Sequence, residues 1–269
     1  MGIARNAANF FLIEGLQRPY AGSVLQLGRQ DIYFGTDQLE SWAQARNFPL
    51  GRKRPLTFSP YCHVPQTRCL DDICFFSHLG FDEIYSCDAS NYEGVDYVFD
   101  LNQPAPPELA NRFDLIFDGG TLEHVFHLPQ SLDNIHQMLK VGGRVVHASP
   151  VSNYVDHGFY SFSPTLFCDY YTANHYRIED AYIIAHTKDP MAESLMFPYV
   201  PEWVERLSFG GFTPEVFGKY TMFMLYIVST KMADSTSGII PTQGRYRRRW
   251  GGEAPLSNIA AQTLQAMLV

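Results

Sequence analysis

The chain has 269 residues, of which 46% are hydrophobic and 18% are charged, and its formal net charge is −8. This length suffices for one large α/β domain or two small ones, and the composition is that of a soluble globular protein. The acidic balance argues against nucleic acid as the main partner, because phosphate binding depends on clustered positive charge. We therefore expect no nucleic-acid partner.

The sequence also argues against a membrane or secreted protein. No apolar run reaches the roughly 18 residues that a membrane helix needs. The first residues, MGIARNAANFFLIEGLQ, lack the basic start, long apolar centre and small-residue cleavage site of a secretory signal. Five cysteines without a regular disulfide spacing fit free thiols in a reducing compartment. We expect a cytoplasmic protein with no membrane partner.

The first part of the chain predicts a helix, a buried strand and an irregular insertion. Apolar residues recur at helical spacing over residues 8–16. The stretch VLQLG, residues 24–28, predicts a buried strand that ends in glycine. A helical pattern resumes over residues 37–45, whereas residues 47–69 contain four prolines and no clear period. We interpret residues 47–69 as an insertion.

Helical and strand patterns then alternate. A helix is predicted over residues 69–79. Strands are predicted over residues 83–88, 96–101, 113–120 and 144–149. The segment LPQSLDNIHQMLKVGG, residues 128–143, predicts a helix closed by Gly142 and Gly143. Alternating strands and helices favour parallel pairing, so we expect a doubly wound, mostly parallel α/β sheet.

The carboxyl ends of the predicted strands carry the candidate binding residues. Gly28, Asp88, Asp100 and Asp118 all fall at such ends, and sheets of this kind bind ligands there. A single strand-end aspartate is often only a helix cap or a turn former. Four such positions in order along the chain favour a shared site.

The order of these motifs resembles that of the class I S-adenosylmethionine-dependent methyltransferases. The likeness covers about residues 20–150 and rests on VLQLG, CDAS, FDLN, FDLIFDGGTLEHV and MLKVGGRVVHASP. It implies a seven-stranded sheet whose last strand runs antiparallel to the rest. KYTMFMLYIVSTK, residues 219–231, is the candidate for that strand, and residues 176–186 for its hairpin partner.

The resemblance also implies a domain organisation. Residues 1–231 would form a methyltransferase-like domain, with the insertion at about 47–69 and a cap-like segment at about 187–218. Residues 232–269 would be a C-terminal extension, whose end could form an amphipathic helix that docks on the domain or on a second subunit, giving a possible homodimer. In this extension GRYRRRW interleaves arginines with aromatics as single-strand nucleic-acid binders do. An exposed charged tail is the simpler interpretation.

The resemblance implies S-adenosylmethionine as the cofactor. The residues that it assigns to cofactor binding are Gln26, Gly28, Asp88, Ala89, Asp100, Leu101, Asp118 and Gly119. Asp88 would hold both ribose hydroxyls, since one carboxylate can accept from two neighbouring hydroxyls. Asp100 with Leu101 would line the adenine, which needs an acceptor for its amine and an apolar slot.

At the methionine end, Gly28 would let the backbone approach the cofactor, and Asp118 with Gly119 would border it. One glycine suffices there, because the three-glycine loop of dinucleotide-binding proteins closes around a pyrophosphate that S-adenosylmethionine lacks. Gln26 stands where the family usually has an acid, and it can hydrogen-bond an ammonium group without charge assistance.

We therefore predict methyl transfer to an oxygen or nitrogen of a small metabolite. The alternative is a relative that binds S-adenosylmethionine but performs other chemistry or only senses the ligand. It is motivated by the departure at Gln26 and by Gln30 and Ile32, which stand where the family usually has glycines. An NAD-dependent enzyme would share the sheet but needs the glycine loop that VLQLGRQD lacks.

Methyl transfer requires a nucleophile held in line with the methyl group, and a base when the nucleophile is an oxygen. The loop of residues 151–164 contains His157, our first candidate for the base, and Tyr160, although loop packing also explains both. His124 is a further candidate. It follows Glu123 in LEHV, and this pair equally fits a local structural role and is weak evidence for a metal.

We expect no bound metal. Suitable zinc ligands occur at Cys62, His63, Cys69, Cys74 and His78. They include no CxxC pair, and Cys74 falls on the apolar stripe of the helix predicted over residues 69–79.

Overall fold

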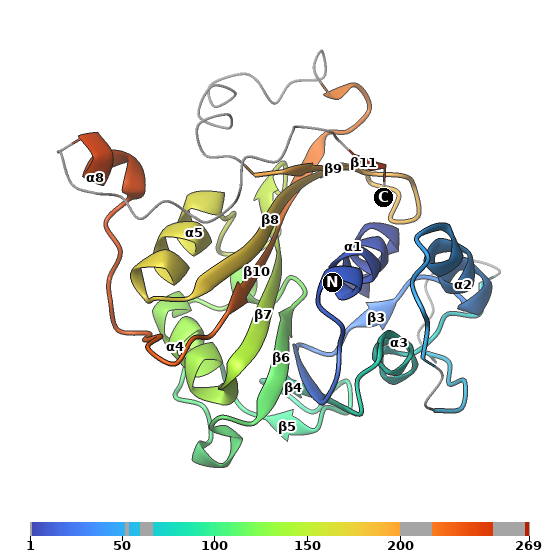
Figure 1. Ribbon diagram of the computed structural model, residues 1–269, viewed down its shortest axis with the longest axis horizontal. Helices are drawn as coiled ribbons and strands as arrows, with labels where there is room; N and C mark the ends of the chain where they lie inside the picture. Colours follow the sequence, from blue (N-terminus) through green and yellow to red (C-terminus); the bar gives the residue numbers. More distant parts are fainter. Residues whose placement is uncertain (1, 52–53, 60–66, 200–216, 250–266, 269) are drawn as a thin grey trace.

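A single large sheet organises the computed structural model, which describes residues 2–51, 54–59, 67–199, 217–249 and 267–268. Its strand order is β11-β9-β8-β10-β7-β6-β2-β4-β5, and helices cover both faces (Figure 1). The strands are β2 (Ser23–Leu27), β4 (Glu83–Asp88), β5 (Tyr97–Val98), β6 (Phe113–Asp118), β7 (Leu139–Ser152), β8 (Arg177–His186), β9 (Leu195–Pro198), β10 (Met222–Thr230) and β11 (Met267–Leu268).

Seven of these strands form the sheet that the resemblance implied. β5, β4, β2, β6 and β7 pair in parallel. β10 pairs antiparallel with both β7 and β8, so β8 runs in the same direction as β7. The last of the seven in chain order, β10, is therefore the antiparallel one. The expectation of a doubly wound, mostly parallel α/β sheet is confirmed.

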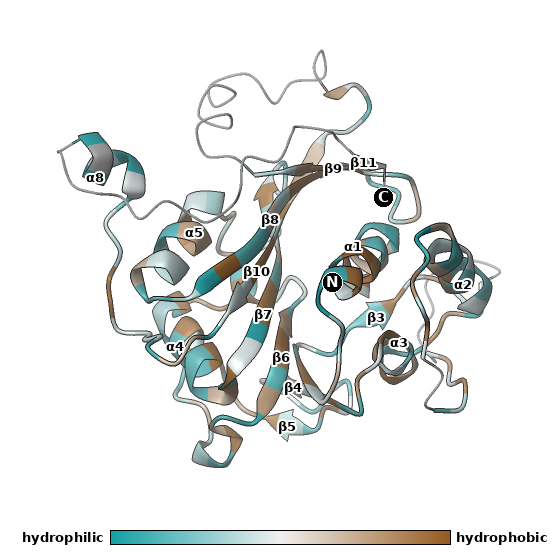
Figure 2. Cartoon of the chain, viewed as in Figure 1, coloured by the Kyte–Doolittle hydropathy of each residue, from teal (hydrophilic) through white to brown (hydrophobic). Residues whose placement is uncertain are grey.

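The helices lie in two layers because consecutive strand residues point to opposite faces of the sheet. The helices are α1 (Arg5–Gln17), α2 (Thr36–Ala45), α3 (Asp72–Leu79), α4 (Leu128–Met138), α5 (Pro164–Ala173) and α8 (Gly244–Arg249), with 3-10 turns η1 (Pro107–Leu109) and η2 (Leu122–His124). Val24 and Val146 join the apolar cluster under α1 and α3, whereas Leu25 and Val145 join the cluster under α4 and α5. Figure 2 shows the apolar residues along the strands and the flanking helices.

The N-terminal segment forms a small separate sheet. β1 (Gly2–Ile3) pairs in parallel with β3 (Asp31–Ile32). α1 follows β1 at once, and most of its residues are buried. This pairing brings the start of the chain close to the loop that follows β2, so that α1 begins beside the strand ends.

Two glycines that we expected to end a helix lie in a strand instead. α4 ends at Met138, because Leu139 already has extended backbone angles and begins β7. Gly142 and Gly143, which we expected to close the helix, lie inside β7, where a Cβ on Gly143 would be 3.0 Å from the carbonyl oxygen of Phe113. The close strand contact, and not a helix cap, explains why Gly143 is a glycine.

The remaining segments refine the sequence expectations. The segment expected to be cap-like contributes β9 to the sheet, and residues 200–216 lie outside the described residues. Cys74, Cys87 and Cys168 are free and buried, but Cys69 is disulfide-bonded, so the expectation of free thiols is wrong for Cys69. Among the described residues, no helix combines the length and the apolar character needed to cross a bilayer.

Candidate functional site

The carboxyl ends of β2, β4 and β6 meet at Gly28. Its amide donates to the carbonyl oxygen of Cys87 at 2.8 Å, and its φ of +70° is a left-handed conformation that favours glycine. A Cβ there would lie 2.8 Å from Oγ1 of Thr121 and 3.9 Å from Oδ2 of Asp88. The structure thus brings Gly28 and Asp88 together and adds Thr121, which the sequence analysis did not identify.

Asp88 and Asp100 extend this edge outward. Asp88 is half-buried, and its Oδ1 accepts from the amide of Ser90 at 3.1 Å, with the exposed Ala89 between them. Asp100 is exposed, and hydrogen bonds from the backbone and side chain of Asn102 lower its pKa. Leu101 beside it is buried. An exposed acid followed by a buried apolar side chain is what the adenine assignment requires.

Gln26 lies beneath this edge and is fully buried. Its Nε2 donates to Oδ2 of Asp72 at 2.8 Å, and its Oε1 accepts from the amide of Gln30 at 3.2 Å. Asp72, at the start of α3, also pairs with Arg29 at 3.0 Å. Asp72 is therefore an acid beside Gln26, and both ends of the Gln26 amide are occupied by protein partners.

Arg29 links the loops that follow β2 and β4. Besides its pair with Asp72, its Nη1 donates to the carbonyl oxygens of Glu93 and Gly94, each at 3.2 Å. Gln30 donates to the carbonyl oxygen of Gly28 at 3.0 Å and packs against Gly119. Gln30 stands at a position where the methyltransferases that the sequence resembles usually have glycine, and its side chain covers Gly119.

Asp118, at the end of β6, is fully buried and its carboxylate turns inward. Oδ1 accepts from the amides of Thr121 and Leu122 at 3.0 and 3.2 Å. Oδ2 lies 2.8 Å from Nδ1 of His147, whose Nε2 lies 2.7 Å from the hydroxyl of Tyr171. These partners favour a tautomer in which Nδ1 donates to Asp118 and Nε2 accepts from Tyr171. The carboxylate holds the strand end in place, and the next residue, Gly119, is buried against the side chain of Gln30.

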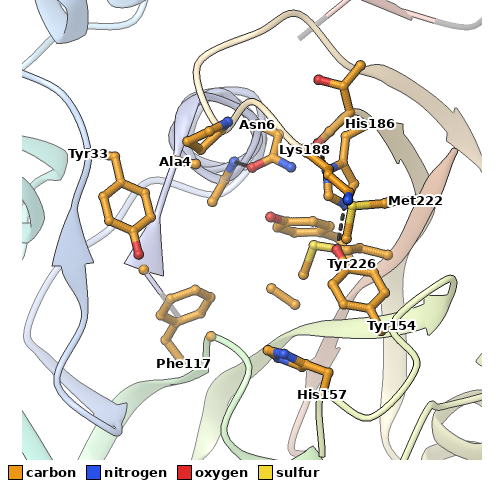
Figure 3. A pocket seen from close by; sticks show the side chains of 17 residues that line it. Ala4, Asn6, Tyr33, Phe117, Tyr154, His157, His186, Lys188, Met222 and Tyr226 are labelled. Carbon is orange, nitrogen blue, oxygen red and sulfur yellow. Dashed lines mark hydrogen bonds between the residues drawn. The ribbon is translucent and has the colours of Figure 1, made fainter. Parts of the chain in front are cut away.

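Gly119 borders a cavity of about 380 Å³, here called the aromatic cavity (Figure 3). Residues from the N-terminal segment, the ends of β6 to β8 and the start of β10 line it. They are Gly2, Ala4, Asn6, Ala7, Tyr33, Phe117, Gly119, Ala148, Tyr154, His157, His186, Thr187, Lys188, Pro190, Met222, Met224 and Tyr226. Aromatic rings and methionines form about half of the wall, and the volume of the cavity falls within the range of small-molecule sites.

Two of the polar groups of the aromatic cavity are already paired with each other. The hydroxyl of Tyr154 lies 2.5 Å from Nε2 of His186, whose Nδ1 lies 2.8 Å from the carbonyl oxygen of Thr187. Nδ1 must donate to that carbonyl, so Nε2 accepts from Tyr154. Burial raises the pKa of Tyr154 and lowers that of His186, which keeps both groups neutral.

His157 is the predicted catalytic residue that lines the aromatic cavity, and burial lowers its pKa. Tyr160 and His124 are not part of that lining. The hydroxyl of Tyr160 donates to the carbonyl oxygen of Phe126 at 2.7 Å, and its ring stacks on Phe162. The ring of His124 contacts that of His157, with 5.0 Å between centroids.

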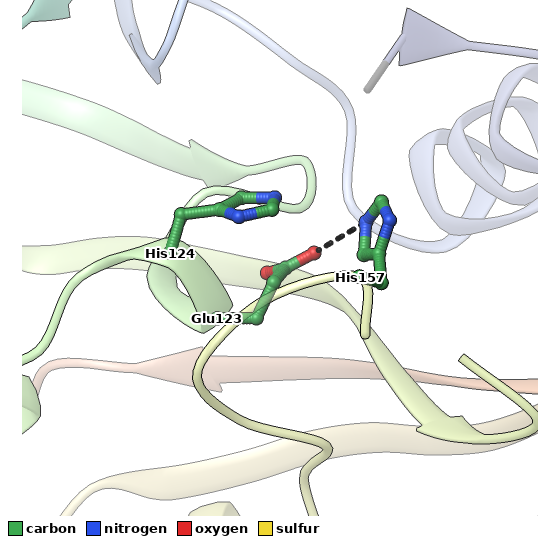
Figure 4. A group of neighbouring side chains, drawn as sticks. All are labelled: Glu123, His124 and His157. Atoms are coloured by element: carbon green, nitrogen blue, oxygen red, sulfur yellow. Dashed lines mark ion pairs between the residues drawn. The ribbon is translucent and has the colours of Figure 1, made fainter. Parts of the chain in front are cut away.

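Glu123 lies between these two histidines (Figure 4). It is fully buried, and Oε1 is 3.6 Å from Nε2 of His157, which is longer than a hydrogen bond. Neither oxygen has a hydrogen-bond partner among the described residues. Burial, with the nearby charge of Asp118, raises the pKa of Glu123 to about 8.

The sequence analysis missed most of the cavity wall. Tyr33, Tyr154, His186 and Lys188 belong to segments far apart in the chain, and none is part of a local motif. One sequence signal could have pointed to Asp72. Gln26 stands where an acid is usual, and this predicts that an acid from another segment lies beside it.

No family model matches the chain, and no curated protein matches it. Several solved structures are similar in overall fold. A Burkholderia thailandensis 1,6-didemethyltoxoflavin-N1-methyltransferase, solved with S-adenosylhomocysteine, is 15% identical with a TM-score of 0.40, over 84% of this chain and 76% of that chain. An Archaeoglobus fulgidus SAM-dependent methyltransferase is 12% identical with a TM-score of 0.43, over 85% and 95%.

A 4+2 cyclase is also similar, at 13% identity and a TM-score of 0.42, over 84% of this chain and 81% of that chain. At these values the likeness decides neither the fold nor the chemistry of this chain. The strand order and the strand ends described above establish the fold and the place of the candidate site.

Proposed function

We propose that this chain is a class I S-adenosylmethionine-dependent methyltransferase that methylates an oxygen or nitrogen of a small molecule. The observation that carries the proposal is the position of Gly119. It lies at the end of β6, beside the strand ends that hold Gly28 and Asp88, and it also lines the aromatic cavity. A cofactor on the strand ends would therefore have its methionine end next to a mostly apolar cavity.

In this proposal each strand end contacts a different part of the cofactor. Asp88 accepts from the ribose hydroxyls through Oδ2, which makes no hydrogen bond to the described residues. The adenine is bordered by Asp100, Leu101 and Ala89. Because position 28 is a glycine, the backbone there can approach the cofactor closely. Because Asp118 is committed to His147, we assign the methionine end to Gly119 rather than to the Asp118 carboxylate.

The acceptor would occupy the aromatic cavity. Methyl transfer needs the acceptor atom in line with the sulfonium carbon, and a rigid wall supplies that orientation. Tyr33, Phe117 and Tyr226 come from three different parts of the fold and present apolar surface to one space. Tyr160 and His124 lie outside the lining, so His157 is the predicted catalytic residue that contacts the acceptor, beside polar wall residues such as Asn6 and Lys188.

The test compares binding of S-adenosylmethionine, S-adenosylhomocysteine and NAD by calorimetry in the wild type and in Asp88→Ala. We expect both S-adenosyl compounds to bind and NAD not to bind. Loss of a hydrogen-bonded carboxylate should weaken their affinity at least about tenfold. Asp234→Ala, which removes an exposed acid of the C-terminal part, should bind as the wild type does. Unchanged affinity in Asp88→Ala would refute the ribose assignment.

A second candidate function is binding of the cofactor without methyl transfer. It is favoured by the network of Gln26, Arg29 and Asp72, which leaves no free acid at the end of β2 for the ammonium group. Transfer of a tritiated methyl group into a metabolite extract separates the two candidates. Label in a small product supports the enzyme, whereas firm cofactor binding without any labelled product supports the sensor.

A further inference from the structure

The side-chain carboxylate of Glu123 is buried without a hydrogen-bond partner among the described residues. A buried polar group is almost always hydrogen-bonded, and a buried charge is paired or bound to a metal. Glu123 has no exposed surface, and both of its oxygens lack a hydrogen-bond partner. Nε2 of His157, the group that faces it, is also buried without such a partner.

The fold brings these groups together through specific backbone contacts. The amides of Phe159 and Tyr160 both donate to the carbonyl oxygen of Glu123, at 2.8 and 3.2 Å. A Cβ on Gly158 would lie 2.7 Å from the same oxygen. Asp156 adopts a φ of +62°, a conformation that is uncommon outside glycine. The loop after β7 is thus tied to η2, and His157 is held against Glu123.

The third member, His124, comes from η2 itself. One ligand atom from each of Glu123, His124 and His157 lies within 4.8 Å of the others (Figure 4). Two imidazole nitrogens and one carboxylate oxygen form a donor set that suits zinc and other first-row transition metals, and not calcium or magnesium, which prefer oxygen.

We propose that Glu123, His124 and His157 form a binding site for one divalent transition-metal ion at the wall of the aromatic cavity. The cation would neutralise the buried carboxylate, and the exposed edge of His124 gives it a path from solvent. Three protein ligands leave coordination positions open, as in catalytic zinc sites. This proposal differs from our expectation of no metal, because the third ligand is brought close only by the fold.

A catalytic role for this metal rests on the proposed function, whereas the metal site can be tested without it. His157 belongs both to the metal ligands and to the cavity wall. An ion bound there could coordinate an oxygen of the acceptor and lower the pKa of its hydroxyl. His157 would then act on the acceptor through the ion and not as the base itself.

The test is a zinc titration of the chelator-treated protein, in competition with a chromophoric chelator and without cofactor or acceptor. We expect one zinc ion per chain. Glu123→Gln, His124→Ala and His157→Ala should each weaken binding at least about 100-fold. The matched control is His127→Ala, since His127 is an exposed histidine of the same segment, and it should bind as the wild type does.

Two outcomes would overturn the proposal: no stoichiometric zinc in the wild type, or wild-type affinity in His124→Ala and Glu123→Gln. Because His124 is exposed, its replacement should leave the fold intact, and circular dichroism checks this for every variant. The titration contains no S-adenosyl compound, so its failure and a failure of the proposed methyl transfer can be told apart.

Discussion

Two buried carboxylates stand at either end of the short loop that follows β6, and their surroundings differ completely. Asp118 accepts from two backbone amides and pairs with His147. Glu123 is equally buried and has no hydrogen-bond partner among the described residues. A buried carboxylate that accepts hydrogen bonds from the protein is compatible with a stable fold. A buried carboxylate without such bonds lowers the free energy of unfolding unless a ligand or a proton neutralises it. The comparison separates a carboxylate whose hydrogen-bond partners are all supplied by the protein from one that we propose to bind a metal ion.

Replacement of Asp118 is expected to have the largest effect on stability and is the strongest test of this comparison. Replacing it with alanine removes one partner of a buried pair and leaves His147 and two amides without their acceptor. We expect a loss of about 3–5 kcal/mol in the free energy of unfolding. Urea denaturation measures this loss. A loss below about 1 kcal/mol would show that the inward network of Asp118 contributes little.

Glu123 should show the opposite behaviour in the metal-free protein. Burial raises its pKa to about 8, above the ordinary value of 4.5 that applies to the unfolded chain. The folded protein therefore binds more protons between these values, and the contribution of Glu123 to stability falls as the pH rises through that window. Glu123→Gln removes this loss, so at pH 9 it should be more stable than the wild type by about 1–3 kcal/mol.

The measurement is urea unfolding at pH 5 and pH 9 in the presence of a chelator. The control is Glu108→Gln, which replaces an exposed carboxylate. Its free energy of unfolding should be close to that of the wild type at both pH values. If the advantage of Glu123→Gln over the wild type is the same at both, the raised pKa is wrong.

The smallest expected effect concerns the hydroxyl at the far end of the Asp118 network. Tyr171→Phe leaves Nε2 of His147 without its donor and should cost about 1 kcal/mol of stability. Tyr160→Phe is the matched control, because the hydroxyl of Tyr160 bonds to a carbonyl oxygen on the surface and its loss should have almost no effect. Equal denaturation midpoints for the two variants would contradict the buried network.

The sequence was most informative about the strands. VLQLG and FDLIFDGG contain consecutive apolar residues, and the structure buries them on both faces of β2 and β6. The expected order of helices and strands is present, and the strand ends at Gly28 and Asp88 meet as expected. β5 is the exception, because of the six residues predicted only Tyr97–Val98 pair with β4. The cytoplasmic location and the homodimer stay predictions.

The sequence by itself determined the sheet and the edge where a ligand would lie, because short runs of apolar residues and turn chemistry are local properties of the chain. Only the tertiary structure decided the direction of each polar side chain. It turned Asp118 inward to His147, paired Gln26 with Asp72, and placed His157 against Glu123 through contacts between segments far apart in sequence. Such contacts depend on the packing of several elements at once, and no short motif records them.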